Sequence, residues 1–289
     1  MRRLARRSDQ GGVALLLVLW ACTLLAILLG GYAALARTES LQARYEFAQA
    51  QAHYAAEAGL MRAVYGLQDP DLKQRWVGDG RIYPFRYDNA NVMVSAIDEG
   101  GKVDLNSATP DVLQAFFQAA GMDLQHAQAL AGNVVDWRGQ AGLDSAATAQ
   151  RAAYVAAGRD YGPRHGPFAS IEELQMVLGM TPAVYQRVAP AVTIWSGNPS
   201  PDPNTAPPLA LAAIPGMTPS QQNAIQAARQ RNTNDPSVVL NNGATQSIRS
   251  EATLVDGTRA VLRATIRFQG GQAKAQPYAV LRWQEGNAE

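Results

Sequence analysis

The first part of the chain carries two successive patterns of apolar residues. From position 13 to position 36 there is no charged residue, and after Arg37 apolar or small residues recur every three or four positions as far as Leu67. Such spacing is typical of one face of an α-helix. The first proline of the chain is Pro70. The pattern therefore predicts one helix over residues 13–67, roughly 80 Å long at about 1.5 Å per residue.

The uncharged half of this helix is long enough to cross a membrane. Twenty-four residues reach roughly 36 Å as a helix, against about 30 Å for a hydrocarbon core. The preceding segment contains four arginines: Arg2, Arg3, Arg6 and Arg7. Basic residues stay on the cytoplasmic side. We therefore expect a single-pass inner-membrane protein whose C-terminal part lies in the periplasm.

Several interpretations of this N-terminus are compatible with its composition. A secretory signal would be cleaved after the apolar run, near residues 30–34, and a signal anchor would remain uncleaved. A prepilin leader would be cleaved before the run, between Gly12 and Val13. The helical pattern that continues beyond Arg37 favours the prepilin leader, because the helix would then be the spine of a pilin-like subunit. A membrane anchor joined to an unrelated soluble helix remains the alternative.

Alternating patterns after Pro70 predict an antiparallel sheet that is split in the sequence. The expected strands cover residues 81–87, 91–97, 247–254, 259–268 and 278–283, with a hairpin turn at Asp256-Gly257. In the strand 259–268 the alternation predicts one solvent-facing side, which is formed by Val261, Arg263, Thr265 and Arg267.

The segment between the two halves of the sheet is predicted to be mostly helical. Thr109, Thr181 and Thr218 each precede a proline, as an N-cap precedes the first helical residue. Ser170 begins a capping-box pattern, and residues 139–167 are expected to be rich in loops. Two Gly-Met-Thr-Pro turns, at 179–182 and 216–219, suggest units similar to a helix-hairpin-helix.

These elements predict an α+β, pilin-like fold with a long N-terminal spine helix, an antiparallel sheet and a large inserted α-helical domain. The expected parts are a leader (1–12), a spine helix (13–67, with 13–36 in the membrane), a head (68–100 and 232–289) and a helical insertion (101–231).

Composition and motifs argue against enzymes and against strong nucleic-acid binding. The net charge is +1, and the chain lacks a nucleophile elbow, a phosphate loop and a His-Glu-x-x-His motif. A membrane-tethered helix-hairpin-helix DNA receptor is kept as an alternative function. However, the Gly-Met-Thr turns lack the second glycine that lets a phosphate approach the backbone, and no lysine lies near them.

No cofactor is predicted. Asp136 and Asp144 flank a polar segment and are the candidates for a hard-cation site such as calcium. Few other acids surround them, so a solvated loop is the favoured interpretation. The single cysteine, Cys22, lies in the apolar run, and no intramolecular disulfide can form.

Nine short motifs together resemble the type II secretion minor pseudopilin K family over nearly the full length of the chain. They lie at residues 12–20, 56–59, 102–106, 134–137, 167–174, 179–182, 188–193, 204–207 and 214–217. The resemblance implies cleavage after Gly12 by the prepilin peptidase and N-methylation of Val13. Family members often carry a denser acidic loop after the Asp-Trp pair, and the sparse acids here argue against a family calcium site in this chain.

The resemblance also implies a place in a filament. Most pilins carry glutamate at the fifth mature position, whereas this chain has Leu17, as is typical of the K subunit. The expected partners are the I- and J-type minor pseudopilins, the major pseudopilin and the inner-membrane assembly platform. We therefore hypothesise a non-enzymatic subunit that initiates or caps a pseudopilus, which drives folded proteins through the outer membrane. A minor pilin of a type IV pilus is the further alternative.

Overall fold

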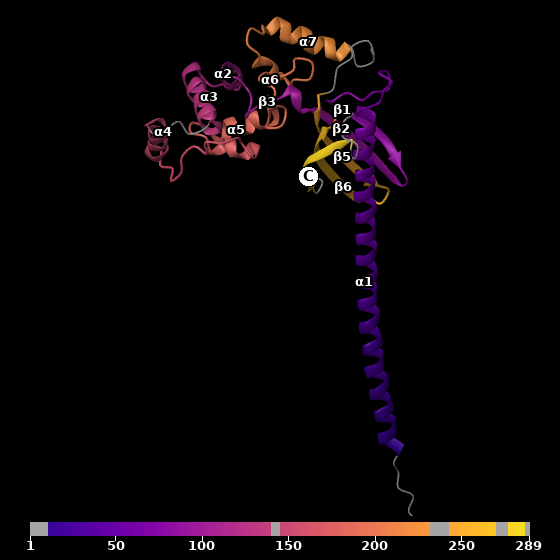
Figure 1. Ribbon diagram of the computed structural model, residues 1–289. Coiled ribbons are helices and arrows are strands. Elements are labelled where there is room, and N and C mark those ends of the chain that lie inside the picture. The colour runs from indigo at the N-terminus through magenta and orange to yellow at the C-terminus, as the bar shows by residue number, and fades with distance from the viewer. Residues whose placement is uncertain (1–10, 140–144, 232–242, 270–276, 287–289) are drawn as a thin grey trace, which may run out of the picture.

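The computed structural model describes residues 11–139, 145–231, 243–269 and 277–286. Helix α1 (Gly11–Leu67) extends far beyond the rest of the molecule, and only its C-terminal part touches the head (Figure 1). The uninterrupted helical pattern predicted this element. Its stem is exposed from Val13 to Phe47, whereas Ala52, Ala56 and Leu60 are fully buried.

Five antiparallel strands form the sheet on which α1 packs. They are β1 (Asp79–Tyr87), β2 (Ala90–Asp98), β5 (Thr245–Leu254), β6 (Arg259–Phe268) and β7 (Tyr278–Gly286), in the order β1-β2-β5-β6-β7. All five predicted strands and the Asp256-Gly257 hairpin are confirmed. The two halves of the sheet meet where β2 pairs with β5, across the whole length of both strands.

A glycine allows α1 to lie very close to this sheet. A Cβ atom on Gly59 would be 2.1 Å from Ser250 Oγ and 2.8 Å from Val92 Cγ1, so a larger residue cannot be accommodated without movement. Gly59 belongs to the Ala56–Gly59 motif noted in the sequence. Its neighbours Ala56 and Leu60 belong to the hydrophobic core between helix and sheet. This motif is therefore explained by close packing.

The prediction that one side of β6 faces solvent is only partly correct. Arg263 and Arg267 are exposed, but Val261 is 1% exposed and Thr265 is 5% exposed. Val261 and Thr265 are buried because β6 lies between β5 and β7, and long polar side chains on those two strands cover it from both sides. Thr265 also hydrogen-bonds Ser247 across the sheet at 2.9 Å.

The chain between β2 and β5 forms a second, mostly helical unit with its own core. It contains, in chain order, η1 (Glu99–Gly101), β3 (Val103–Asp104), α2 (Pro110–Ala119), α3 (Leu124–Arg138), α4 (Ser145–Ala156), η2 (Ile171–Met176), α5 (Pro182–Val188), η3 (Ala189–Ala191), β4 (Val192–Thr193), α6 (Pro208–Ala212) and α7 (Pro219–Arg231). Strands β3 and β4 pair in parallel as a separate small sheet.

The predicted N-caps are present: Thr109 and Thr181 accept hydrogen bonds from Val112 N and Val184 N, and Thr218 accepts one from Gln221 N. The capping box at Ser170 is wrong. Residues 171–176 form a 3₁₀ helix, and the Ser170 side chain makes no capping bond.

The physical reason for this correction lies with Glu173, which would have to reach back to Ser170. Its carboxylate instead bonds Arg164 at 2.5 Å and Trp137 Nε1 at 3.4 Å. The expectation of a loop-rich segment over 139–167 is also wrong in part, because α4 occupies Ser145–Ala156. Alanine has the highest helix propensity, and α4 contains six alanines.

Candidate functional site: the exposed spine and a groove at its head

The stem of α1 presents an apolar surface that nothing within the described residues covers. Val13 is 70% exposed and Leu17 is 66% exposed. The segment Val13–Leu67 is, within the described residues, the one helix that is long and apolar enough to span a membrane. A stem of this kind is stable only in lipid or against other apolar helices. Gly12 lies in the first turn of α1, directly before this surface.

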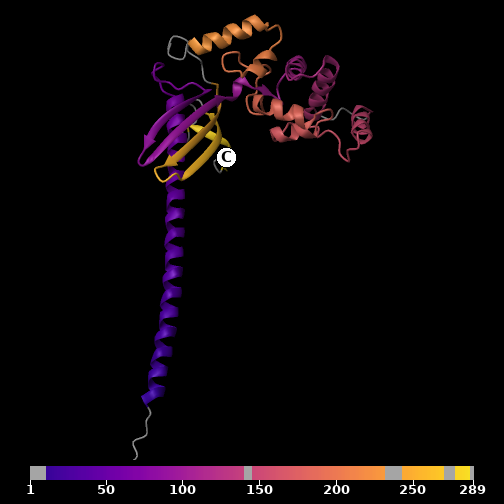
Figure 2. The same cartoon turned by 180° about the vertical axis from the view of Figure 1, so that it is seen from behind.

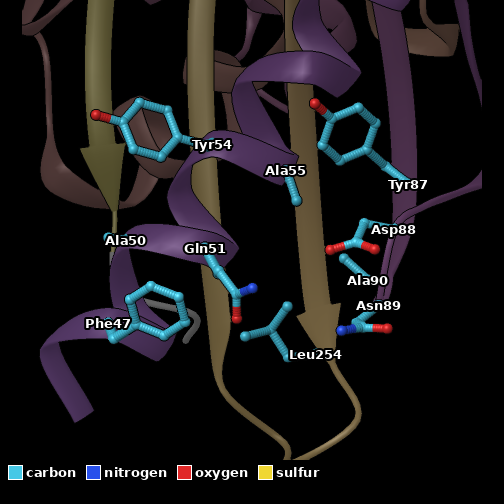
Figure 3. A pocket seen from close by; sticks show the side chains of 10 residues that line it. All are labelled: Phe47, Ala50, Gln51, Tyr54, Ala55, Tyr87, Asp88, Asn89, Ala90 and Leu254. Atoms are coloured by element: carbon cyan, nitrogen blue, oxygen red, sulfur yellow. The ribbon is translucent and has the colours of Figure 1, made fainter. Parts of the chain in front are cut away.

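Where the stem meets the head, α1 and the β1–β2 turn enclose an apolar groove of about 200 Å³. Figure 3 shows Phe47 and Tyr54 of α1 on one side and Tyr87 on the other, with Leu254 between them. Phe47 is 67% exposed and Tyr54 is 66% exposed, so these rings are available to a partner.

The turn that closes the groove has a defined backbone. Asp88 adopts a left-handed conformation, with φ at 49°, which asparagine and aspartate tolerate better than most residues. The adjacent Ala90 and Leu254 are buried and pair with each other across β2 and β5. The groove therefore rests on the end of the sheet where β2 and β5 pair. Its lining is suited to receiving an apolar side chain rather than to acid–base chemistry.

Sequence reasoning did not find this groove. The helical pattern identified the buried side of α1 but passed over Phe47 and Tyr54. The available signal was the presence of two aromatic residues on the side of an amphipathic helix that should be polar.

The Lys-Val-Asp-Leu-Asn motif at 102–106 has a structural role. Asp104, which is 1% exposed, accepts hydrogen bonds from Asn106 N at 2.8 Å, Gly197 N at 2.8 Å and Ser196 Oγ at 3.0 Å. Asn106 in turn binds both the N–H and the carbonyl of Phe168, at 2.7 and 3.1 Å. The motif ties together segments that lie far apart in the sequence.

Asp98 lies where the chain leaves the large sheet for the helical unit. Its carboxylate accepts hydrogen bonds from Gly100 N at 2.8 Å and from Gly243 N at 2.7 Å, which joins the outgoing and returning chain. Burial raises the pKa of this carboxyl group, and repulsion from Asp202 and Glu99 acts in the same direction. Lys102 compensates Glu99 through an ion pair at 2.6 Å.

The candidate cation ligands are not brought together in the part of the chain that the structure describes. Asp136 is half-buried on α3, and Asp144 lies outside the described residues. Within the described ranges, no three histidine, cysteine, aspartate or glutamate side chains are grouped as metal ligands.

The two Gly-Met-Thr-Pro turns serve the core of the helical unit. Gly179 and Gly216 both have positive φ, and α5 and α7 begin shortly after them. Met180 is 6% exposed and belongs to that core, so its side chain does not point to a ligand.

Comparison with known proteins identifies a similar family and a similar solved structure. Residues 89–197 match the family described as type II secretion system (T2SS), protein K. No curated protein matches the chain. Among solved structures, the GspK-GspI-GspJ complex of the type 2 secretion system of enterotoxigenic Escherichia coli contains a similar fold. That likeness has a TM-score of 0.57 and 18% identity, and it covers 87% of this chain and 100% of the other.

Together, these findings confirm the resemblance to the minor pseudopilin K family and the expected fold class. The matched segment begins in the β1–β2 turn and ends after β4, so it spans the motifs at 102–106, 134–137, 167–174, 179–182 and 188–193. The matched family is a structural component of a secretion apparatus and not an enzyme.

Proposed function

We propose that this chain is the K-type minor pseudopilin at the tip of a type II secretion pseudopilus, where it initiates or caps the filament and aids export of folded proteins. The observation that carries the proposal is the combination of a helical unit that matches the K family, over 89–197, with an exposed apolar stem that requires lipid or neighbouring helices.

The place at the tip is supported by Leu17. In a pilin spine the glutamate at the fifth mature position is thought to meet the amino terminus of a neighbouring subunit. A charged side chain in the centre of a membrane costs about 2.5–3.5 kcal/mol on insertion scales, so it requires such a partner. A terminal subunit has no further subunit to supply the partner, and an apolar residue is then the stable choice.

The proposal includes cleavage of the N-terminal leader. The prepilin peptidase would cleave between Gly12 and Val13, and the new amino terminus at Val13 would be methylated. The head would lie in the periplasm and the segment 13–36 in the inner membrane. The mature protein would keep the whole stem from Val13, which runs without interruption into the head.

The proposed partners are the I- and J-type minor pseudopilins, whose counterparts form a complex with GspK in the similar structure, together with the major pseudopilin and the assembly platform. The groove between α1 and the β1–β2 turn supports this, because a parallel spine helix beside α1 would place apolar residues near Phe47 and Tyr54. We also propose that the chain beyond the spine helix divides into a head, formed by 68–100 and 232–289, and a helical insertion, formed by 101–231.

A secretion assay in a strain that lacks this chain tests the proposal. Wild-type chain should restore export and should carry a methylated Val13 at its amino terminus, as measured by mass spectrometry. Leu17→Glu should reduce export, whereas Leu17→Ile should not. An unprocessed Met1 in the mature protein, or full export in the absence of the chain, would refute the proposal.

A further inference from the structure

The face of the large sheet that points away from α1 is termed the outer sheet face. Side chains alternate between the two faces of a strand. Because Val92 and Val94 of β2 point into the core with α1, Met93 and Ile97 lie on the outer face. Figure 2 shows this face of the strands in front of α1, with the helical unit to one side.

One half of the outer sheet face is apolar. Ile82 is 62% exposed, Met93 is 50% exposed and Ile97 is 39% exposed. Pro84 lies directly opposite Met93, and Ile82 lies opposite Ser95, so these residues are immediate neighbours on β1 and β2. Single exposed apolar residues are common on soluble domains, but a contiguous group indicates an interaction site.

The other half is cationic. The outer positions of β5, β6 and β7 contain one glutamate, Glu251, and five arginines: Arg249, Arg259, Arg263, Arg267 and Arg282. Glu251 pairs with Arg249 at 2.8 Å and also with Arg259. Positive charge is therefore in excess on this half of the face.

Arg249 and Arg263 are direct cross-strand partners. Like charges in that relation destabilise a sheet. The remaining arginines have other contacts: Arg282 lies 3.5 Å from Glu172 of η2, and Arg267 donates to the carbonyl of Trp195 at 2.8 Å. Arg263 is exposed and has no carboxylate partner among the described residues.

We propose that the outer sheet face binds a protein partner that presents an acidic segment beside apolar side chains. The carboxylates would pair with Arg263 and Arg249, and the apolar side chains would cover Met93 and Ile82. A guanidinium group binds a carboxylate with two parallel hydrogen bonds, so one acidic side chain between these arginines relieves their mutual repulsion.

The position of the face selects a protein partner over a membrane. The sheet packs on the end of α1 that lies farthest from the apolar segment 13–36, so the arginines lie well away from lipid headgroups (Figure 1). The face also points away from α1, and none of its described residues lines the groove at Phe47 and Tyr54 that the proposed function assigns to a spine-packed neighbour. The proposed contact is therefore separate from that groove.

The test uses the purified full chain in detergent micelles and a fluorescent peptide of alternating glutamate and valine as the probe. Fluorescence anisotropy at low salt should show binding, and the corresponding glutamine–valine peptide should bind at least about tenfold more weakly. Arg263→Glu should raise the Kd of the acidic peptide about tenfold, and Met93→Ser should raise it severalfold. Arg151→Glu on α4, outside the face, is the matched control and should leave the Kd within about twofold.

A stability measurement separates loss of binding from loss of folding. Arg263→Glu places a carboxylate opposite Arg249, so its melting temperature should equal or exceed that of the wild type while binding is lost. Three results of the peptide-binding assay would overturn the proposal. These are equal affinity for the glutamate and glutamine peptides, a rise in Kd for Arg151→Glu as large as that for Arg263→Glu, and no binding by the wild type. Self-association of the chain through this face, seen by sedimentation and abolished by Arg263→Glu, would replace the acidic partner with a second copy and would also overturn it.

Discussion

Replacement of Gly59 by alanine tests the packing of the spine against the head. The added Cβ would be 2.1 Å from Ser250 Oγ, 2.8 Å from Val92 Cγ1 and 3.0 Å from Val94 Cγ2, and three simultaneous overlaps cannot be relieved by one rotamer change. Overpacking of a core typically costs 1–3 kcal/mol, and we place this case at about 3 kcal/mol because the site is fully enclosed. Alanine recovers about 1 kcal/mol of helix propensity, which leaves a loss of about 2 kcal/mol.

The assay is thermal unfolding of the full chain in detergent micelles, followed by near-ultraviolet circular dichroism. For a folding unit of this size a loss of about 2 kcal/mol lowers the melting temperature by about 4–8 °C. Gly132→Ala is the matched control, because Gly132 also lies within a helix and a Cβ there would meet nothing within 4 Å. That variant should be unchanged or more stable by up to about 1 kcal/mol.

A second substitution identifies the contact responsible. Ser250 Oγ is buried and has no hydrogen-bond partner, so Ser250→Ala removes the nearest obstacle without breaking a bond. The double variant should recover part of the lost stability, with the contacts to Val92 and Val94 accounting for the remainder. If Gly59→Ala melts at or above the wild-type temperature, α1 does not lie against β5 as described.

Three further predictions concern other parts of the molecule. Asn106→Ala should destabilise the helical unit by about 1–3 kcal/mol, because both hydrogen bonds to Phe168 are lost, whereas Asn91→Ala on the exposed outer face should have little effect in the same melting assay. Burial raises the pKa of Asp98, so the folded state binds the proton of this carboxyl group more tightly than the unfolded state does. The stability of the wild type should therefore fall relative to that of Asp98→Asn as the pH rises from about 4 through the folded-state pKa. A stability difference between the two proteins that is constant with pH would contradict this. Phe47→Ser should leave the melting temperature within about 1 °C because the ring is 67% exposed, yet it should reduce co-purification of the I- and J-type pseudopilins; unchanged co-purification would remove the groove as a contact site.

Local patterns predicted most elements of the fold. The uncharged run and the helical spacing predicted α1, and the alternation of residues predicted all five strands of the large sheet. Helix α4 was missed although its alanines favour a helix, whereas the capping box failed because of contacts with distant residues. Glu173 was expected to cap its own helix at Ser170, but Arg164 and Trp137 hold its carboxylate.

The candidate site depended even more on long-range contacts. The groove forms because residues 47–55, 87–90 and 254 meet in space, and no local spacing indicates that meeting. The same is true of Asp104, which accepts hydrogen bonds from Ser196 and Gly197, 92 and 93 positions further along the chain. The sequence motif at 102–106 was recognisable, whereas its role as a tie between segments required the structure.

We propose that this chain is the tip subunit of a minor pseudopilin complex. The sharpest test is native mass spectrometry of the full chain, extracted in detergent after co-expression with I- and J-type pseudopilins and the prepilin peptidase. We expect a complex with one copy of each subunit, in which this chain begins at a methylated Val13. A chain that retains Met1, or that forms no complex with the two pseudopilins, would refute the proposal.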